Sequence, residues 1–406
     1  MKRLQIALAA ALAVGTAVSG AWAPSARAQG TESAKVGFIT DLSGAYADLD
    51  GPGGADAIRM AVEDYGGKAL GRPVEVLVAD HQNKPDIAAS KAREWFDQRN
   101  LSLLIAGANS AAALALNNLS AEKKRILITI SAGSDRLTNE ACQPYGIHYA
   151  YDTVALARGT ASAMVRNGDK RWYFLTADFA FGQSLEKAAA DVVARSGGTV
   201  LGAARHPAGT PDFSSFLLQA QGSKPQVLGL ANAGSDTINS IKAVSEFGLN
   251  KTMKVAGLLV FISDIHSLGL PITQGMLLTD SWYWDQDDAS RAFAARYFAR
   301  NKRMPTSAQA ANYSATMLYL KAVDRVKTTD ADKVMAELKS VKIDDFYTRG
   351  YIRKDGRGVH DMYLYEVKAP SESKKPWDYL KRVSTIPGDQ AFRTLDESVC
   401  PLVKKS

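Results

Sequence analysis

The chain repeats one local pattern: a short apolar run, a loop of small residues, then an amphipathic stretch. The first copy opens with Val36-Gly37-Phe38-Ile39, which is too short for a helix and predicts a buried strand. A loop ending in Asp50-Gly51-Pro52-Gly53-Gly54 follows, and then a helix with Ala57, Met60 and Ala61 on its apolar face. Successive units of this kind predict a parallel sheet with helices on both faces. Such sheets bind ligands at the carboxyl ends of their strands.

Further copies of the pattern give the elements expected along the chain. The expected strands are Val74–Ala79, Leu103–Ala106, Ile126–Ile130, Trp172–Thr176, Thr199–Arg205, Val227–Leu230, Met276–Ser281 and Met362–Val367. The expected helices are Pro85–Arg99, Thr153–Asn167, Phe213–Gln221, Ala289–Arg300, Ser307–Val326 and Ala331–Ser340. We expect an irregular segment at Cys142–Asp152, a hairpin turn at Lys354–Arg357 and an irregular tail from Ala369 to Ser406. The pattern restarts near residue 153, which indicates a domain boundary.

The first 28 residues have the composition of a cleaved export signal. Lys2 and Arg3 precede an apolar run from Leu4 to Ala23, and Ala26-Arg27-Ala28 forms an A-x-A cleavage site. The alternative is an N-terminal membrane anchor, but the small-residue cleavage site favours a signal peptide. No later stretch approaches the roughly 18 consecutive apolar residues of a membrane helix. We therefore expect an exported protein.

Charge and cysteine content narrow the possible partners and the compartment. The formal net charge of +7 comes from dispersed Lys and Arg residues, without a basic run interleaved with aromatics, so nucleic-acid binding is not indicated. In an oxidising compartment the two cysteines, Cys142 and Cys400, predict one disulfide, with two buried free thiols as the alternative.

Motifs of enzymes and cofactor sites are missing. The chain has no G-x-S-x-G, H-E-x-x-H or G-x-x-x-x-G-K-[ST] sequence, and its five histidines show no i, i+4 pairing. The glycines at 51, 53 and 54 follow a long loop, which argues against a dinucleotide site. We therefore expect no catalytic residue, no metal and no cofactor.

Two strand-end loops are candidates for binding a carboxylate. Gly107–Ser110 and Ser131–Asp135 combine hydroxyl groups with small residues whose backbone N–H groups can face an anion. The candidate residues in them are Asn109, Ser110, Ser131, Gly133 and Ser134. Ordinary helix capping is the alternative for any one of these side chains.

Aromatic residues follow other strands and could wall an apolar ligand. They form three groups at expected strand ends: Tyr149 and Tyr151, Phe179 and Phe181, Trp282 and Trp284. Each alone is as well explained by packing. Asn232 and Asp236 follow another strand; Asp236 could hold a ligand amine, and its alternative role is an N-cap.

Three motifs, together with the order of elements, resemble the periplasmic substrate-binding proteins of branched-chain amino-acid-type ABC transporters. These motifs are Gly37–Gly44, Asp178–Gln183 and Asn312–Ala315, and the resemblance spans Lys35–Val367. It implies a type I periplasmic-binding-protein fold: an α/β protein with two Rossmann-like lobes on parallel sheets, joined by a three-crossover hinge. It also places crossovers near Asp152, Ser281 and Tyr347.

The resemblance further implies lobe boundaries and roles for particular residues. It divides the chain into a signal peptide at 1–28, an N-terminal lobe at 34–152 plus 282–346, a C-terminal lobe at 153–281 plus 347–368, and a tail at 369–406. The family's carboxylate loops match Asn109-Ser110 and Ser131–Ser134, and its aromatic positions match Tyr151 and Phe179 or Phe181. The family's acidic amine-binding position falls in Asn232–Asp236, where this chain has no Glu among aromatics.

These observations lead to one functional expectation and its rivals. We expect a non-enzymatic, monomeric periplasmic receptor that captures a small aromatic or apolar carboxylate between two lobes and delivers it to an inner-membrane ABC permease. The predicted site comprises Asn109, Ser110, Ser131, Gly133, Ser134, Tyr151, Phe179, Phe181, Asn232, Asp236 and Trp284. The alternatives are a branched-chain amino acid or an amide as ligand, a periplasmic ligand sensor, and an enzyme that uses the same cleft.

Overall fold

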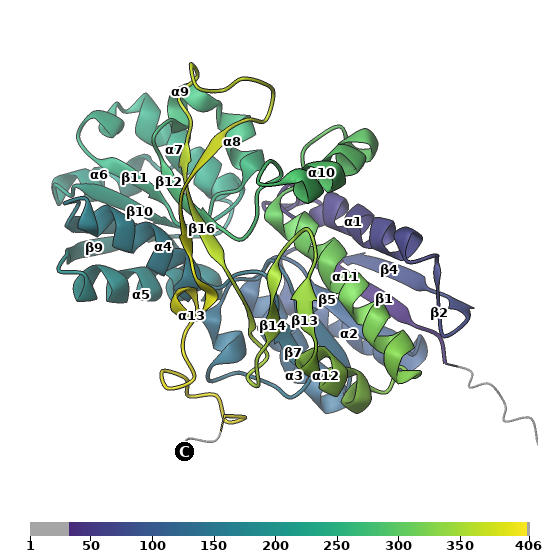
Figure 1. The fold of residues 1–406 in the computed structure, drawn as a ribbon. Helices are drawn as coiled ribbons and strands as arrows, with labels where there is room; N and C mark the ends of the chain where they lie inside the picture. Colours follow the sequence, from purple (N-terminus) through teal and green to yellow (C-terminus); the bar gives the residue numbers. More distant parts are fainter. Residues whose placement is uncertain (1–31, 404–406) are drawn as a thin grey trace, which may run out of the picture. The chain divides into compact units, whose positions relative to one another are not determined.

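The computed structural model describes residues 32–403, and residues 33–403 belong to one compact unit. The predicted signal peptide lies outside the described residues. The fold is built on two parallel sheets with helices on both faces, together with smaller antiparallel sheets (Figure 1). The sequence-based prediction of an α/β protein with parallel sheets is confirmed.

The first sheet has five parallel strands in the order β4-β1-β5-β6-β7. Its strands are β1 (Lys35–Thr40), β4 (Glu75–Asp80), β5 (Leu103–Ala106), β6 (Ile126–Thr129) and β7 (Gly146–His148). The four strands predicted from apolar runs are confirmed. The expectation of an irregular Cys142–Asp152 segment was wrong at Gly146–His148, which pairs in parallel with β6 as the edge strand.

Alternate residues of this sheet point into two different packing layers. Phe38, Ile105 and Ile128 belong to the large core that includes α1 and α11, whereas Leu104 and Leu127 pack with the aromatic and alanine side chains of α2. The alternation follows from the two-residue period of a strand. The helices that accompany this sheet are α1 (Gly51–Asp64), α2 (Pro85–Gln98), α3 (Ser110–Lys123), α10 (Asp288–Asn301), α11 (Ser307–Val326) and α12 (Ala331–Ser340).

The second sheet has four parallel strands in the order β11-β10-β8-β9. They are β8 (Arg171–Ala177), β9 (Thr199–His206), β10 (Val227–Ala231) and β11 (Lys254–Gly257). Three of them were predicted, and β11 was not. The helices around this sheet are α4 (Thr153–Arg166), α5 (Ala180–Arg195), α6 (Ser214–Gly222), α7 (Ser235–Glu246), α8 (Ile262–Leu268) and α9 (Leu270–Thr273).

A third sheet connects the end of the chain to the rest. Its antiparallel strands are β12 (Leu277–Asp280), β16 (Met362–Val367) and β17 (Leu380–Ile386), in the order β12-β16-β17. The expectation of an irregular tail was therefore wrong for β17 and for the short helix α13 (Gly388–Ala391). Both lie among polar residues, so β17 lacks the alternating apolar pattern from which strands were predicted.

The remaining elements are short. They are β2 (Lys68–Ala69), β3 (Arg72–Pro73), β13 (Lys342–Asp344), β14 (Arg349–Ile352), β15 (Gly358–His360), and the 3-10 turns η1 (Asp135–Thr138) and η2 (Leu249–Lys251). β14 and β15 pair across the turn predicted at Lys354–Arg357, which confirms that hairpin.

Strand neighbours indicate where the chain crosses between the two lobes. The first two connections run from β7 to α4 and from β12 towards α10, near the predicted Asp152 and Ser281. For the third crossover, strand pairing favours a position later than the expected Tyr347, because His148 of β7 forms a parallel bridge with Arg357, whereas β16 pairs with β12. Asp361, between β15 and β16, is the position that this pairing favours. The crossovers and the lobe boundaries stay a prediction.

The C-terminal segment after β17 links parts of both lobes. Cys142 and Cys400 form the predicted disulfide, with a Cα–Cα distance of 5.7 Å. Arg393 forms an ion pair of 2.6 Å with Asp135 near the first sheet. Arg158 of α4 forms one of 2.8 Å with Glu397. This segment is thus a fourth connection between the lobes, fixed at its far end by a covalent bond.

We expect reduction of Cys142–Cys400 to lower the melting temperature. The bond spans 258 residues, and by restricting the unfolded chain it stabilises the folded state by about 2–4 kcal/mol. The measurement is thermal unfolding of the purified protein with and without reductant. A Cys142→Ser/Cys400→Ser double variant is the control, and its melting temperature should not respond to reductant. Titration of two free thiols in the unreduced protein would contradict the pairing.

Candidate functional site

Loops that follow six parallel strands meet around one small cavity. Its lining comes from the loops after β1, β5 and β6 in the first sheet and after β8, β10 and β11 in the second. The cavity is lined by Tyr46, Leu49, Ala108, Asn109, Ser110, Ser131, Ala132, Gly133, Phe179, Phe181, Ala233 and Leu259. This is the edge at which parallel α/β sheets bind ligands.

Six of the predicted site residues line this cavity. They are Asn109, Ser110, Ser131, Gly133, Phe179 and Phe181. Gly133 lies between two rings: a Cβ atom added to it would lie 3.0 Å from Phe181 and 3.2 Å from Tyr151. A larger side chain at position 133 would therefore displace the aromatic wall.

The polar groups of the loops after β5 and β6 are largely engaged with one another. The Ser110 hydroxyl accepts a hydrogen bond of 3.1 Å from the Ser134 backbone N–H, which leaves its own proton free to donate. The Ser134 hydroxyl lies 2.8 Å from that of Ser184 on α5. Asn109 is the N-cap of α3, where its side chain accepts from the Ala112 N–H at 3.0 Å. For Asn109 the capping alternative is therefore what the structure shows.

Ser131 is held from behind by a buried acid. Its hydroxyl donates to the carboxylate of Asp50, which also accepts a hydrogen bond from the Asn312 side chain of α11. Asp50 is fully buried, and burial raises its pKa to about 7 although the hydrogen bonds from Ser131 and Asn312 oppose the shift. Asp50 thus links the start of α1, α11 and the loop after β6.

The aromatic wall includes residues that sequence analysis missed. Tyr46 lies 6.4 Å from Phe179 between ring centroids, and its buried hydroxyl has no hydrogen-bond partner among the described residues. Burial, and then the nearby Asp236 and Asp41, raise the pKa of Tyr46. The loop is held in place because the Asp41 carboxylate accepts from the Tyr46 N–H at 2.9 Å. The signal in the sequence is the position of Tyr46 in the loop after the first strand.

Tyr151 stands behind the cavity wall. It is 1% exposed, and its hydroxyl donates to the Ser131 carbonyl at 2.7 Å. Its ring lies 6.1 Å from that of Phe261 between centroids, and it would contact a Cβ atom added to Gly133. In this arrangement Tyr151 supports the loop after β6 and does not line the cavity.

Asn232, Asp236 and Trp284 are not among the residues that line the cavity. The Asn232 side chain bonds with His206, Ser240 and Thr237. The Asp236 carboxylate accepts from the N–H groups of Gly209 and Thr210 at 3.1 and 3.0 Å. The N-cap of α7 is Gly234, so Asp236 lies in the first turn and is not the cap. The Trp284 N–H donates to the Trp377 carbonyl at 2.9 Å, which ties it to the tail.

Contacts across the cleft indicate a closed arrangement. The N–H of Ser235, at the start of α7, donates to the Ala45 carbonyl at 3.1 Å. Gly234 permits this approach, because it has φ +60° and an added Cβ would lie 2.2 Å from the Ala45 oxygen. The cavity volume is about 20 Å³, room for roughly one water-sized group. A solute could therefore enter only when the lobes separate.

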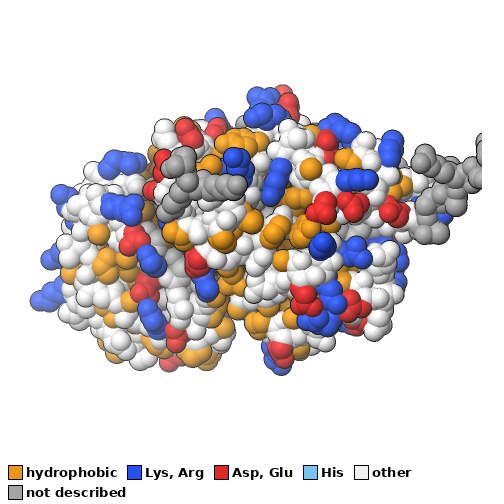
Figure 2. All heavy atoms as spheres, turned by 90° about the horizontal axis from the view of Figure 1, so that it is seen from below, with side chains coloured by type: hydrophobic (Ala, Val, Ile, Leu, Met, Phe, Trp, Pro, Cys, Tyr) orange, Lys and Arg blue, Asp and Glu red, His pale blue; other side chains and the backbone are white. Residues whose placement is uncertain are grey.

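Among residues 32–403, no helix is long and apolar enough to cross a membrane. The described part of the chain also holds no cluster of three or more His, Cys, Asp or Glu side chains arranged to bind a metal ion. On the face seen in Figure 2, Lys and Arg side chains are interspersed with Asp and Glu and do not gather in one basic patch.

Comparison with known proteins identifies the class. A model of the periplasmic binding protein family matches residues 33–375, so the chain belongs to the periplasmic binding proteins. A periplasmic binding protein from Burkholderia mallei is 64% identical, with a TM-score of 0.91, and the match covers 92% of this chain and all of that one.

Two further relatives narrow the family. A branched chain amino acid ABC transporter periplasmic ligand-binding protein from Burkholderia xenovorans is 41% identical, covers 91% of this chain and all of that one, and has a TM-score of 0.82. The Leu/Ile/Val-binding protein homolog 6 of Brucella melitensis is 25% identical over 65% of this chain and 66% of that protein, slightly under two thirds of its length. The chain is thus a solute-binding protein of the branched-chain amino-acid ABC transporter type, with the type I fold.

We expect the stability contributed by Asp50 to depend on pH. Its pKa is about 7 in the folded chain, above its ordinary value of 3.8, so the folded state holds this proton more tightly than the unfolded state. The contribution is complete below about pH 4 and declines as pH rises towards 7, by at most about 1.4 kcal/mol per pH unit. The melting temperature of the wild type minus that of Asp50→Asn should fall from pH 4 to 7 and then level off.

The matched control for this measurement is Asp48→Asn, because Asp48 lies two residues away and has an exposed side chain. The difference in melting temperature between the wild type and Asp48→Asn should be nearly constant from pH 4 to 7. A constant difference for Asp50→Asn as well would show that Asp50 is ionised in the folded protein throughout.

Proposed function

We propose that this protein binds a small carboxylate with an aromatic or other apolar body between its two lobes and delivers it to an inner-membrane ABC permease. The observation that carries this proposal is the aromatic and hydroxyl lining of the cavity at the strand ends. Membership of the periplasmic binding proteins supports the periplasm as its place of action. The export signal and the monomeric state are predictions that accompany the proposal.

The two ends of such a ligand have different surroundings in the cavity. Ser110 offers a hydroxyl proton, and the start of α3 offers the partial positive charge of a helix N-terminus, so this end suits the carboxylate. The opposite wall, formed by Tyr46, Phe179 and Phe181, suits an apolar ring or chain. Tyr46 adds a buried hydroxyl that a polar ring substituent could pair with.

The lining disfavours an α-amino group. No Asp or Glu is among the residues that line the cavity, and both carboxylate oxygens of Asp236 accept backbone hydrogen bonds instead. A buried ammonium without a carboxylate partner is costly.

A solved structure of a solute-binding protein from Rhodopseudomonas palustris in complex with benzoate is 20% identical, with a TM-score of 0.79 over 88% of this chain and 97% of that one, and it shares the fold alone.

A branched-chain amino acid or an amide is the second candidate. It is favoured by the name of the Burkholderia xenovorans relative, which is 41% identical to this chain. In this case the amine would need a partner that the closed cavity does not present, so Asp236 would have to release the turn at Gly209 and Thr210.

Closure explains how binding is signalled to the permease. The contacts of Ser235 with Ala45 and of Ser134 with Ser184 form only when the lobes meet. A ligand that touches both lobes adds affinity to a closed state whose cavity is wider than the about 20 Å³ of the present arrangement, and so shifts the population towards that state. A permease that recognises the closed surface would then distinguish loaded from empty receptor. A periplasmic sensor would use the same closure with a different partner.

We expect aromatic carboxylates to raise the melting temperature and leucine or valine to have no effect. A ligand at a hundred times its dissociation constant adds about 2.7 kcal/mol to the stability of the folded state. The measurement is thermal unfolding with benzoate, 4-hydroxybenzoate, leucine, valine and benzamide. Phe181→Ala should weaken the aromatic response at least tenfold, whereas Phe247→Ala, at an exposed position, should not. A response to leucine or valine alone would replace the proposed ligand class by the second candidate.

We expect Ser110→Ala to weaken carboxylate binding about tenfold, because it removes a hydrogen-bond donor to a charged group. The readout is isothermal titration with the acid identified in the screen and with its neutral amide. The ratio of acid to amide affinity should fall in Ser110→Ala and stay unchanged in Ser196→Ala, which alters an exposed hydroxyl after α5. An equal loss of affinity for acid and amide would assign Ser110 a packing role only.

A further inference from the structure

A second and much larger cavity lies at the other end of the second sheet. Its lining includes the residues where β8, β11 and β12 start, which are Asp169, Met253–Val255 and Gly275–Leu277. The residues of the second sheet that line the cleft cavity instead follow the ends of β8, β10 and β11. Its volume is about 660 Å³, within the range of small-molecule sites in proteins. The two cavities therefore occupy opposite ends of the same strands.

The cavity exists because two sheets diverge. β11 is the edge strand of the second sheet and β12 is the edge strand of the third, and neither is hydrogen-bonded to the other. Deeper in the fold they approach closely, since a Cβ added to Gly257 would lie 3.2 Å from the sulfur of Met276. Towards their first residues the strands separate, and the edges of α4 and α7 complete the walls.

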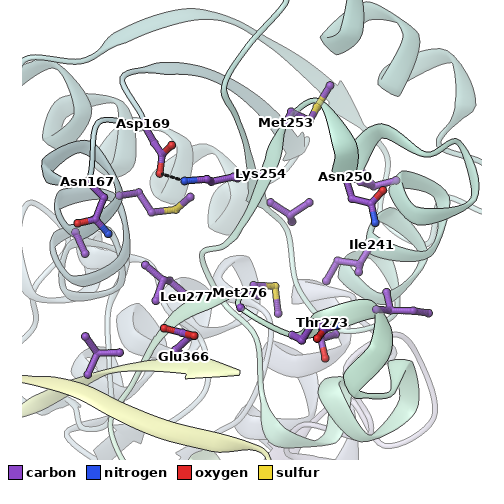
Figure 3. Close-up of a pocket in the computed structure, with 18 of the residues that line it drawn as sticks. Asn167, Asp169, Ile241, Asn250, Met253, Lys254, Thr273, Met276, Leu277 and Glu366 are labelled. Atoms are coloured by element: carbon purple, nitrogen blue, oxygen red, sulfur yellow. Dashed lines mark hydrogen bonds and ion pairs between the residues drawn. The ribbon is translucent and has the colours of Figure 1, made fainter. Parts of the chain in front are cut away.

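The lining contains no aromatic ring: one part of it, the floor, is aliphatic, and polar side chains such as Asn167, Ser245 and Thr273 make up the rest. Met164, Met253 and Met276 line the floor together with Ile241, Val244 and Leu277, and Figure 3 shows Met253, Met276, Ile241 and Leu277 around the open space. Flexible thioether side chains adapt to aliphatic chains of varied shape. The cleft, in contrast, presents Tyr46, Phe179 and Phe181.

Among the charged side chains that line the cavity, one cation has no ion-pair partner within the described residues. Lys254 pairs with Asp169 at 2.9 Å, as drawn in Figure 3, and Glu366 pairs with Lys381 at 3.0 Å. Arg166, the last residue of α4, also lines the cavity, and it forms no ion pair or side-chain hydrogen bond within residues 32–403. A guanidinium is well suited to a carboxylate.

We infer that this cavity is a second ligand site, which binds an aliphatic carboxylate with its chain on the methionine floor and its carboxylate at Arg166. The site does not rest on the proposed function of the cleft. Its lining comes from α4, α7, α9, η2, the start of β11 and the third sheet, and none of it comes from the first sheet, so occupancy does not require the lobes to close.

The test uses octanoate as the probe and methionine methyl groups as reporters. In protein labelled with [methyl-¹³C]methionine, octanoate should shift the signals of Met164, Met253 and Met276 in a saturable way. Met60 and Met335, which lie on α1 and α12 beside the first sheet, should not respond. Absence of a saturable shift up to about 10 mM octanoate would overturn the proposal.

Matched variants test the position and the charge. Arg166→Gln should weaken octanoate binding about tenfold. Arg195→Gln, which changes the last residue of the neighbouring helix α5, should leave binding unchanged. Asn250→Trp should abolish the shifts, because Asn250 is exposed at the cavity wall and a large ring there fills the space. Equal affinity in Arg166→Gln and Arg195→Gln would overturn the assignment of the carboxylate to Arg166.

A final variant separates this site from the cleft. Phe181→Ala should leave the octanoate response of the three methionines unchanged, even if it removes binding of aromatic acids. Loss of the response in Phe181→Ala together with its retention in Asn250→Trp would place octanoate in the cleft and overturn the second site. Conversely, failure of every aromatic acid in the cleft screen would not affect the octanoate result.

Discussion

A buried arginine at the hinge joins the segments on which the closed structure depends. Arg357 is fully buried; its guanidinium donates to the carbonyls of Gly358 and Tyr151, and it forms an ion pair of 3.5 Å with Asp152. Phe392 of the tail lies under it, 4.4 Å from the guanidinium carbon to the ring centroid. The first crossover, the segment before the third crossover and the tail therefore converge on one side chain. Burial lowers the pKa of Arg357 to about 10, so it stays charged at neutral pH.

The contacts of Arg357 constrain the site because two of its partners, Tyr151 and Asp152, lead directly to the cleft loops and to α4. Asp152 caps α4 by accepting from the Ala155 N–H at 2.9 Å, which fixes where the second lobe begins. Tyr151 then reaches back to the Ser131 carbonyl, at the loop that lines the cavity. A buried ion pair contributes little net stability, but removal of one partner leaves a costly charge. The hinge is thus held by buried polar contacts, and the cleft loops are positioned from it.

The sequence predicted the parts of this structure that have a local cause. Apolar runs and small-residue loops revealed seven of the nine strands in the two parallel sheets, because buried parallel strands are apolar throughout. The edge strands β7 and β11 were missed because each contains a single large apolar residue, Ile147 and Val255, and so neither forms an apolar run. The polar strand β17 was missed because most of its residues are polar and exposed, although its partner β16 is the strand directly before it in the chain.

The same reasoning explains the outcome for the candidate site. Ser110, Ser131, Gly133, Phe179 and Phe181 follow strands directly, so their meeting at one edge follows from the topology alone. Asp236 and Trp284 also stand near strand ends, but their partners are the turn at Gly209 and the tail residue Trp377. Nothing in the local sequence specifies those partners. A polar side chain at a strand end is available to a ligand only if no other segment already supplies its hydrogen-bond partners.

The two cavities lie at opposite ends of one sheet and are lined by different kinds of side chain. At the carboxyl ends of the strands the chain must leave through loops, and these loops carry rings and hydroxyls that move with the lobes. At the opposite ends the strands start between helices, and the space is lined by aliphatic side chains whose positions are fixed by packing within one lobe. Under the two proposals, a ligand in the cleft would change the relation between the lobes, whereas a ligand in the second cavity would contact one lobe alone. Coupling between the two cavities could pass along β8 and β11, which contribute to both, or along α7, which lines the second cavity and contacts Ala45 at its first residue.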